Sequence, residues 1–244
     1  MISTATDITQ RRVGDIVTAD ARAAVVFERH GLDFCCGGHR TLEEACRTRG
    51  VSAAGVASEL SALGPPGAAD QLPPEWSDLD VLARFILKTH HEYVKSTMPV
   101  ILQWLDRLVD RHGPGHPELA GVRMEFRALA DELNGHLQKE EMILFPYVAD
   151  MARAKRNGGY LPPGCFSTIL GPVQVMEDEH EHAGQSLERL RALTHDYALP
   201  ADACTTYRSC YAELDRFDKD LRRHIHLENN ILFPRAIEME QTFR

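Results

Sequence analysis

Two segments of this chain repeat one pattern of residues that can bind metal ions. HLQKEEMILFP spans His136–Pro146, and HIHLENNILFP spans His224–Pro234. In each copy a glutamate, Glu140 or Glu228, follows the histidine by four residues. Side chains four residues apart lie on one face of a helix, so each His–Glu pair can reach the same cation. Two such pairs indicate a binuclear metal site.

The duplication extends upstream of both motifs. His91 lies 45 residues before His136, and His180 lies 44 residues before His224. Each repeat unit is therefore a helix with one histidine, followed by a helix with the His-x-x-x-Glu motif. One unit cannot enclose a metal ion, but two packed units form a four-helix bundle with every candidate ligand pointing inward. The candidates are His91, His136, Glu140, His180, His224 and Glu228.

Four histidines and two glutamates make a nitrogen and oxygen ligand set, which suits iron, manganese or zinc. Iron is favoured over zinc, because structural zinc sites are usually tetrahedral with cysteine ligands and catalytic zinc typically has three protein ligands. Two imidazoles per metal and two carboxylates that can bridge predict a pair of non-haem iron ions that share an oxo or hydroxo group. Six protein ligands leave coordination positions open, which nitric oxide, dioxygen or water could occupy.

Other histidines lie next to the proposed ligands. His90 is adjacent to His91 and faces about 100° away from it on a helix. The repeat spacing alone does not separate the two, so one is a ligand and the other a neighbouring or surface group. We prefer His91 and keep His90 as its alternate. His182 and His226 lie two residues from proposed ligands, face another side of the helix and are expected to be exposed.

Each of these histidines and glutamates could also have a role that involves no metal ion. An isolated His-x-x-x-Glu pair is usually a solvated pair worth about 0.2–0.5 kcal/mol. We favour the metal site because the two copies have matched apolar contexts, each after a similarly spaced histidine. Glu132 and Glu179 could be carboxylates that orient ligands or carry protons near the metals. Solvated surface glutamates are an equal alternative for both.

A second reactive feature is DFCCGG at Asp33–Gly38, where adjacent cysteines precede two glycines. Adjacent cysteines close only a strained ring, so a structural disulfide is not expected. The glycines allow a tight turn that leaves both sulfurs accessible, and such thiols suit redox exchange, metal capture or metal transfer. The alternative is that Cys35 and Cys36 are buried as small apolar residues. The other cysteines are isolated and expected to be inert: Cys46, Cys165, Cys204 and Cys210.

Changes in composition divide the chain into residues 1–63, a linker at 64–77 and residues 78–244. The first part contains short helix candidates with capping residues or terminal glycines, at Asp20–His30, Leu42–Arg49 and Ala53–Leu63. GPPGAADQLPP at Gly64–Pro74 has the glycine, proline and small-residue composition of a linker. The first part is therefore predicted to be a small helical domain.

Four longer helices are predicted beyond the linker. The first covers about Asp78–His112, with a kink or break near Pro99, and the second covers Pro117–Met151 or slightly beyond, with Pro146 interrupting its last turns. The third covers about Val173–Tyr197, and the fourth covers about Ala203–Glu228 and meets a proline again at Pro234. A connection rich in glycine and proline, Asn157–Pro172, precedes the third helix. No stretch shows convincing β alternation, so the predicted fold class is all-α: a four-helix up-down bundle with a small N-terminal helical domain.

The composition narrows the functional classes. Among 244 residues, 27 Lys and Arg against 36 Asp and Glu give a net charge of −9, and no basic stripe favours binding to a nucleic-acid backbone. No apolar run approaches the roughly 20 residues that span a bilayer. The first residues, MISTATDITQRR, lack the apolar stretch of a signal peptide. We expect a cytoplasmic protein without nucleic-acid or membrane partners.

Five motifs together resemble those of the repair-of-iron-centres proteins of the YtfE/ScdA type. They are DFCCGG, HHEYVKSTMP at His90–Pro99, HLQKEEMILFP, VMEDEHEHAG at Val175–Gly184 and HIHLENNILFP, and together they extend over nearly the whole chain. The resemblance implies a small ScdA-type N-terminal domain with a cysteine pair, and a hemerythrin-like bundle with a non-haem di-iron centre. Oxygen-carrying hemerythrins have more histidines and a His-x-x-x-x-Asp ending, so reversible oxygen transport is less expected here.

The resemblance implies the same six ligands, with both glutamates bridging, and a functional thiol pair at Cys35 and Cys36. It also implies a role under nitrosative or oxidative stress in restoring damaged iron–sulfur clusters, with the damaged proteins as clients. In our first hypothesis the centre releases or donates iron, and the thiols mediate transfer or redox.

Two other hypotheses remain open. One is an enzyme in which a diferrous centre reduces two nitric oxide molecules to nitrous oxide. The other is a buffer or sensor that binds nitric oxide or oxygen reversibly. A homodimer is also expected, because a small domain on a linker could pack against the bundle of a second copy.

Overall fold

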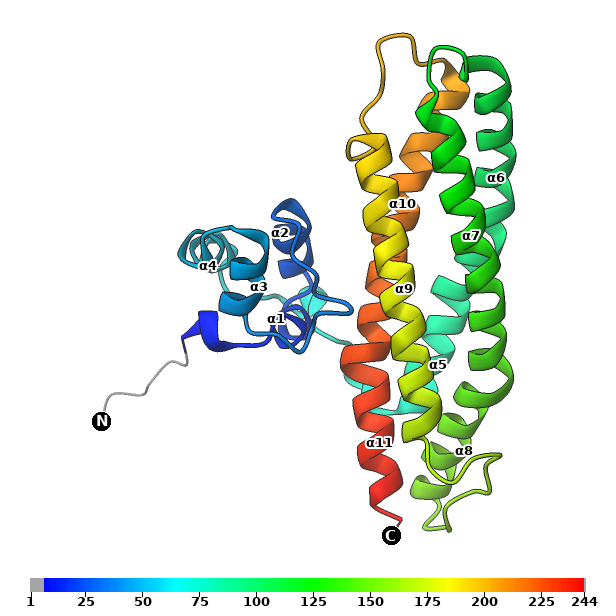
Figure 1. Cartoon of the computed structure of the whole chain (residues 1–244). Helices are drawn as coiled ribbons and strands as arrows, with labels where there is room; N and C mark the ends of the chain where they lie inside the picture. Colours follow the sequence, from blue (N-terminus) through cyan, green and yellow to red (C-terminus); the bar gives the residue numbers. More distant parts are fainter. Residues whose placement is uncertain (1–6, 244) are drawn as a thin grey trace.

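The computed structural model describes residues 7–243 of this chain (Figure 1). Residues 1–6 of the predicted N-terminal domain and Arg244 of the predicted bundle lie outside the described residues. Within residues 7–243 every regular element is a helix, and a single isolated β-bridge joins Arg12 and Thr41. Long helices form one bundle and short helices form a smaller unit beside it, which confirms the predicted fold class.

The short helices of the N-terminal unit are α1 (Val13–Ala19), α2 (Ala23–Arg29), α3 (Leu42–Arg49) and α4 (Ala53–Ala62). Helix α3 begins with a capping box, because the Thr41 hydroxyl accepts the Glu44 N–H and the Glu44 carboxylate accepts the Thr41 N–H. Gly50 ends it in the left-handed region, with φ of 70°. Helix α1 was not predicted, since Arg12 before it provides no side-chain cap.

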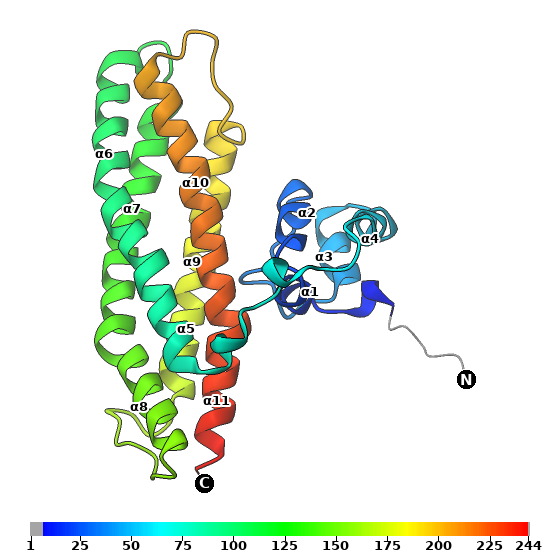
Figure 2. The ribbon, with the colours of Figure 1, turned by 180° about the vertical axis from the view of Figure 1, so that it is seen from behind.

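Each of the four bundle helices keeps its predicted place in the chain, but three of them contain a π-helical turn. The first consists of α5 (Leu79–Ile86), a π turn (Leu87–His91) and α6 (Glu92–His112). The second consists of α7 (Glu118–Lys139), a π turn (Glu140–Leu144) and α8 (Phe145–Arg156). The third is α9 (Leu170–Thr194), and the fourth consists of α10 (Thr205–Leu227), a π turn (Glu228–Leu232) and α11 (Phe233–Gln241). The up-down arrangement is visible from behind in Figure 2.

The bundle helices continue through the prolines at which the sequence predicted a kink, a break or an interruption. Helix α6 continues through Pro99 without a break, and the fourth helix continues beyond Glu228 to Gln241. Pro146 and Pro234 are each the second residue after a π turn. Proline lacks the N–H that an α-helical turn would use, and the wider turn before it allows the helix to continue.

The bundle interior has two apolar clusters with a polar layer between them. One cluster contains Val94, Leu133 and Ile225, together with the core of the N-terminal unit. The other contains Ile86, Leu144 and Leu232 at the opposite end of the bundle. His91 lies between Ile86 and Val94 in the first helix, and the other candidate ligands occupy the corresponding level of their helices.

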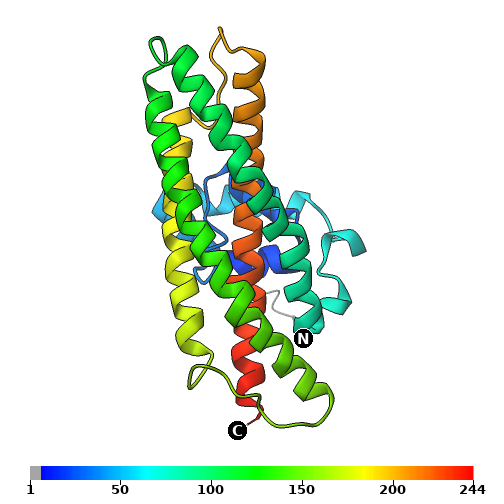
Figure 3. The ribbon, with the colours of Figure 1, turned by 90° about the vertical axis from the view of Figure 1, so that its right-hand side faces the viewer.

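The N-terminal unit packs on the side of the bundle formed by α9, α10 and α11, as the side view in Figure 3 also shows. Helix α1 contacts the π turn Glu228–Leu232. An ion pair between Arg49 and Glu188 of α9, 3.2 Å apart, joins the two parts. None of the described helices has both the length and the apolar character needed to cross a membrane.

Candidate metal centre

The six predicted ligands meet in the polar layer, and all of them are buried. The first helix contributes His91 and helix α9 contributes His180, whereas the second and fourth helices each contribute a histidine and the glutamate that begins their π turn. His91 is the last residue of the first turn, while Glu140 and Glu228 are the first residues of the other two. An inserted π turn is frequent at functional sites, because it changes the face that the following side chains present.

The six side chains form two overlapping groups. His91 and His224 form one group with Glu140 and Glu228, and His136 and His180 form the other with the same two glutamates. The Nε2 atoms of His91 and His224 are 3.1 Å apart, and those of His136 and His180 are 3.0 Å apart. We call the His91–His224 pair the first metal position and the His136–His180 pair the second metal position.

Both glutamates extend across the two positions. Oε2 of Glu140 lies 3.4 Å from Nε2 of His91 and 3.4 Å from Nε2 of His136. Oε1 of Glu228 lies 2.9 Å from Nε2 of His224, while its Oε2 lies 3.1 Å from Nε2 of His180. This is the arrangement expected of two carboxylates that bridge a pair of cations.

Unsatisfied oxygens test whether cations fit this site. Within residues 7–243, both carboxylate oxygens of Glu140 and Oε2 of Glu228 are buried and accept no hydrogen bond. A buried acceptor without a partner costs about 1–3 kcal/mol, and more if it is charged. Cations between the carboxylates and the ring nitrogens would remove that cost, and the nitrogen and oxygen donors suit iron, manganese or zinc. The residues therefore fit a metal centre.

The ionisation of the glutamates agrees with this chemistry. Burial and the charge of Glu228 oppose ionisation of Glu140, but the nearby imidazoles of His136 and His91 outweigh them and lower its pKa to about 2. The pKa of Glu228 is also held well below its usual value by His224 and the other histidines, despite burial. Two carboxylates therefore stay charged in a buried layer and require positive charge beside them.

Protons can provide that charge when cations do not. Burial opposes protonation of His91, but the carboxylates of Glu140 and Glu228 raise its pKa to about 10. The same balance raises the pKa of His136 to about 9, again against the effect of burial. Metal ions and protons therefore compete for this site.

Three of the four imidazoles are held in orientation through Nδ1. Nδ1 of His91 lies 2.9 Å from Oε1 of Glu141, which also accepts from Nζ of Lys95 at 2.7 Å. Nδ1 of His180 lies 2.7 Å from Oδ1 of Asn229. Acceptors of this kind fix the tautomer and the ring direction of a metal-binding histidine.

The third oriented ring belongs to His136. Its Nδ1 lies 2.9 Å from Oε2 of Glu179, and Glu179 also pairs with Lys139. The carboxylate of Glu179 thus contacts a candidate ligand directly. Nδ1 of His224, by contrast, is buried and has no hydrogen-bond partner within residues 7–243.

His90 lies outside both ligand groups. It is buried, and its Nδ1 lies 3.0 Å from Oδ1 of Asp220. Its ring stacks on that of His224, with centroids 5.5 Å apart and an angle of 8° between the planes. The geometry thus favours His91 over His90 as the candidate ligand.

Glu132 is exposed and forms part of the lining of a cavity of about 370 Å³ beside His136 and Glu179. His182 is exposed as expected. The prediction for His226 is wrong, because its ring is buried against Phe34 with centroids 5.8 Å apart. Burial lowers the pKa of His226 to about 4, so this ring is neutral.

The cysteine pair lies in a tight loop built on Asp33. One oxygen of its carboxylate accepts the backbone N–H groups of Cys35 and Cys36 at 3.1 and 3.0 Å, and the other accepts that of Gly37 at 2.9 Å. The two sulfurs are 3.8 Å apart. The expectation that both sulfurs are accessible is wrong for Cys35, which is buried in the core of the N-terminal unit, whereas Cys36 is partly exposed. A hydrogen bond with Cys36 and burial raise the pKa of the Cys35 thiol well above its usual value.

This loop contacts the ligand-bearing helices directly. Sγ of Cys36 donates to the backbone carbonyl of His180 at 3.3 Å. Nδ2 of Asn230 lies 3.2 Å from the carbonyl oxygen of Phe34 and 3.1 Å from that of Cys35. A Cβ on Gly38 would lie 2.1 Å from Oδ1 of Asn230, so a larger residue there would displace this amide. The cysteine loop is therefore held against two ligand-bearing helices, by Asn230 in the π turn that begins at Glu228 and by the His180 carbonyl of α9.

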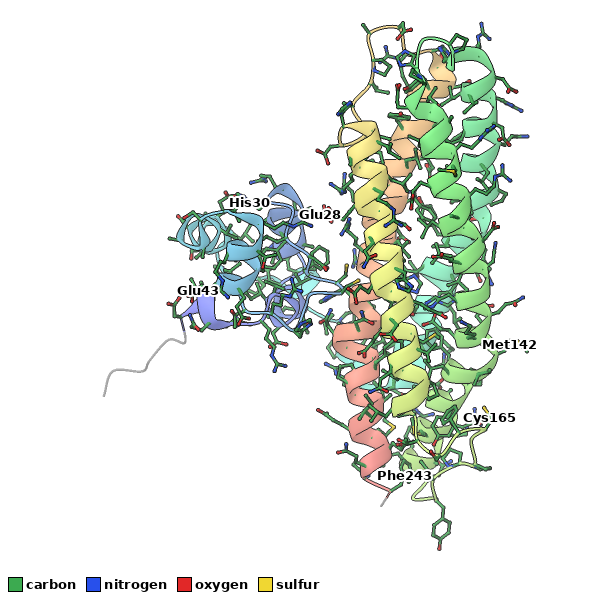
Figure 4. The ribbon with its side chains drawn as sticks, viewed as in Figure 1. Glu28, His30, Glu43, Met142, Cys165 and Phe243 are labelled. Carbon is green, nitrogen blue, oxygen red and sulfur yellow. The ribbon has the colours of Figure 1, made fainter. Side chains whose placement is uncertain are left out.

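Sequence reasoning missed Glu141, Asn229 and Asn230. The only signal available was position, because Glu141 and Asn229 each follow the glutamate of one motif copy. Among the isolated cysteines, partly buried Cys204 immediately precedes α10, Cys210 is buried within α10, and exposed Cys165 lies at the end of the bundle (Figure 4).

Comparisons with known proteins agree with this architecture. Residues 83–236 match the hemerythrin HHE cation binding domain, and residues 9–64 match the ScdA N-terminal domain, which is described as a domain of unknown function. The chain is 34% identical over 237 residues to the iron-sulfur cluster repair protein YtfE of Musicola paradisiaca, which covers 95% of this chain and 98% of the relative. It is 34% identical over 236 residues to the YtfE proteins of Yersinia pestis and Yersinia pseudotuberculosis, covering 96% of this chain and 100% of each relative.

Proposed function

We propose that this chain, which belongs to the hemerythrin HHE family and within it to the YtfE iron-sulfur cluster repair proteins, restores damaged iron–sulfur clusters with iron held in its bundle. The observation that carries the proposal is the pair of buried glutamates shared by two histidine pairs. In this proposal two non-haem iron ions are held by His91, His136, Glu140, His180, His224 and Glu228, and both glutamates bridge.

The residues around the site support release of iron as well as binding. Iron ions bound at this site would be a source of iron for transfer, and their unfilled coordination positions could bind a small ligand such as nitric oxide or dioxygen. As iron leaves, His91 and His136 can each take up a proton at Nε2, because their pKa values are about 10 and 9 in the cation-free site. Protons therefore balance the charge of both carboxylates after release.

Each of these two histidines has a route for charge to the surface. One series of contacts runs from His91 through Glu141 to Lys95, whose side chain is 46% exposed. The other runs from His136 through Glu179 to Lys139, whose side chain is 47% exposed. Glu179, and Glu132 in the adjacent cavity, are thus proposed to assist the movement of charge between the second metal position and solvent.

Cys35 and Cys36 are proposed to mediate transfer or redox exchange between the centre and a client. The contact from Cys36 to the His180 carbonyl supports this role, because it brings an accessible sulfur next to a ligand-bearing segment. The partly exposed sulfur also lies in a cavity of about 310 Å³ that contains Glu177 and Glu181. The clients are proposed to be proteins with damaged iron–sulfur clusters.

The arrangement of helices also supports the proposed division into residues 1–63, 64–77 and 78–244. Helix α4 ends at Ala62 and α5 begins at Leu79. The intervening segment contains only short 3₁₀ turns at Ala68–Asp70 and Pro74–Ser77.

Reactivation of an iron–sulfur hydratase inactivated by nitric oxide tests the proposal. Anaerobic iron-loaded protein should restore hydratase activity, and iron content should fall in step. His136→Leu and His224→Leu should lose both iron and reactivation, since each removes one of the nitrogen donors. His116→Leu is the matched control, because the partners of His116 within residues 7–243 include none of the candidate ligands; they are Glu118, Asp202 and the rings of His112 and Tyr207.

The thiols are tested separately in the same assay. Cys35→Ser/Cys36→Ser should keep its iron but restore the hydratase more slowly. Full reactivation by this variant would show that the thiols take no part, and reactivation by the histidine variants would contradict the role of the metal centre.

A second candidate function is reduction of nitric oxide to nitrous oxide. It is favoured by the shared carboxylates, because they bring two cation positions side by side and would hold two substrate molecules close together. Gas analysis after mixing the reduced protein with nitric oxide separates the candidates. Nitrous oxide without loss of iron would support reduction, whereas iron loss without nitrous oxide would support donation.

A further inference from the structure

The two repeats of the bundle bring equivalent residues to equivalent histidines. Glu141 and Asn229 each follow the glutamate of one motif copy. Glu141 lies 2.9 Å from Nδ1 of His91, and Asn229 lies 2.7 Å from Nδ1 of His180. In both repeats, therefore, this residue orients the first histidine of its own repeat.

A second pair of equivalent positions breaks the symmetry. Glu179 immediately precedes His180, and His90 immediately precedes His91. Both reach the second histidine of the other repeat, but with different chemistry. Glu179 offers an oxygen 2.9 Å from Nδ1 of His136, whereas the His90 ring stacks on His224 with centroids 5.5 Å apart.

The stacked ring leaves His224 without an acceptor. Its Nδ1 is buried and has no hydrogen-bond partner within residues 7–243, while Nδ1 of each of the other three candidate ligands has one. His90 directs its own Nδ1 to Asp220, 3.0 Å away. The residue that could have oriented His224 is therefore engaged elsewhere.

This difference affects the cation-bound form more than the free form. A histidine that binds a cation through Nε2 must keep its proton on Nδ1, and at His224 that N–H would be buried without an acceptor. In the free form the proton can move to Nε2, which lies 2.9 Å from Oε1 of Glu228. Release of the cation therefore costs less free energy at His224 than at the other ligands.

We propose that the first metal position is the weaker of the two and releases its cation first, with His90 as the positioning residue responsible. The inference rests on the ligand set of the proposed function and adds an order of release to it. Substitutions of residues that orient metal-binding histidines typically change affinity by about 10–100-fold. We therefore expect release from the first position to be faster by about tenfold or more.

The order of release can be measured on crystals of the full chain loaded anaerobically with Fe²⁺. After soaks of increasing length in a chelator, anomalous scattering at the iron edge gives the occupancy of each position separately. Earlier loss at the His91–His224 pair is expected. Equal loss, or earlier loss at the His136–His180 pair, would overturn the inference while leaving the ligand set intact. Absence of iron from both positions before chelation would overturn both.

Variants at position 90 test the cause in solution through the two phases of Fe²⁺ release to a chelator. His90→Gln offers a neutral acceptor to His224 and should slow the fast phase by about tenfold. His90→Phe keeps a stacked ring without an acceptor and should leave the fast phase unchanged.

Asn229→Leu provides the converse test, because it removes the acceptor of His180 and should accelerate the slow phase alone. If His90→Gln does not fold, Asn229→Leu and the crystal occupancies still test the order of release. A fast phase unchanged in His90→Gln, or a slow phase unchanged in Asn229→Leu, would contradict the role given to the Nδ1 acceptors.

Discussion

At the scale of single residues, the charges of the six candidate ligands couple metal binding to proton release. Two buried carboxylates remain ionised, and the pKa values of His91 and His136 are raised to about 10 and 9 by those charges, against the effect of burial. A cation that enters this site must displace these protons, so affinity should fall as pH decreases. The same linkage determines how the metal-free chain responds to pH.

The metal-free chain should lose stability as pH rises from about 6.5 to about 9. A histidine whose pKa is higher in the folded state stabilises fully below its unfolded pKa of about 6.5, and this stabilisation is lost as pH rises through the folded value. We expect the apparent Tm to fall by at least about 5 °C, since about 1 kcal/mol corresponds to about 2–4 °C for a protein of this size. Calorimetry of the protein after a chelator has removed its metal ions measures this change in Tm.

The Zn²⁺-saturated chain is the control for that prediction. The cations replace the protons, so its Tm should change much less over the same range of pH. A metal-free chain whose Tm is constant or rises toward pH 9 would contradict the assigned protonation of His91 and His136.

Asn230 is the residue that holds the cysteine loop in place. Asn230→Ala removes the amide that contacts the carbonyl groups of Phe34 and Cys35. We expect alkylation of Cys36 to accelerate by about 30-fold, because a typical hydrogen bond is worth about 1 kcal/mol and two are lost. Mass spectrometry of the alkylated protein reports each cysteine separately.

Cys46 is the internal control for that experiment, because it is buried in the core of the N-terminal unit away from the loop. Its reactivity should remain unchanged in Asn230→Ala. Equal acceleration at Cys46 and Cys36 would indicate unfolding of the unit, and no acceleration at Cys36 would remove Asn230 from this role.

At the scale of helices, a buried charge network joins α9 and α10. Asp218 of α10 is fully buried and accepts from Nε of Arg222 at 2.6 Å and from the hydroxyl of Tyr197 at 3.0 Å. Arg191 of α9 pairs with the same carboxylate. Arg222 also pairs with Glu188 at 3.1 Å and Arg191 with Asp196 at 3.6 Å, but Asp218 is the fully buried acid that both arginines share.

Asp218→Ala should destabilise the protein by about 3–5 kcal/mol, because it removes the fully buried acceptor that two arginines share and leaves them only their more exposed partners. Urea denaturation of the Zn²⁺-saturated chain measures the change. Asp215→Ala on the same helix is the matched control. Its partner Lys219 is 2.6 Å away and 49% exposed, and such a surface pair is worth about 0.5 kcal/mol or less. Equal effects of the two substitutions would contradict the importance of the buried network.

The helices also show which features the sequence could predict. A spacing of four residues is a local property of a helix, so the sequence alone could pair His136 with Glu140 and His224 with Glu228. The π turns were not predicted, because they depend on the packing of prolines and ligands within the bundle. Burial of His226 was missed for the same reason, since Phe34 covers it from the other part of the chain.

At the scale of the whole molecule, the N-terminal unit docks on its own bundle. The contact between Cys36 and the His180 carbonyl lies within one chain. Periodicity and motif spacing describe each part separately, so they could not predict this docking or the partial burial of the thiols. The exposed side chains of Met142 and Cys165 lie on the side of the molecule away from that contact (Figure 4).

Docking within one chain predicts that alkylation of Cys36 is independent of protein concentration. The amide of Asn230 and the carbonyl of His180 that cover the loop belong to the same molecule as the thiol. Rates measured with excess reagent across a wide range of protein concentration check this. Faster alkylation on dilution would instead indicate that the N-terminal unit docks on the bundle of a second copy.

The proposed function of the whole molecule depends on two iron ions that share the pair of buried glutamates. Iron analysis combined with Mössbauer spectroscopy of the anaerobically purified, ⁵⁷Fe-enriched protein tests this directly. We predict about two coupled non-haem iron ions per chain, as the nitrogen and oxygen ligand set implies. Zinc in place of iron, or a single uncoupled iron ion, would contradict the proposal.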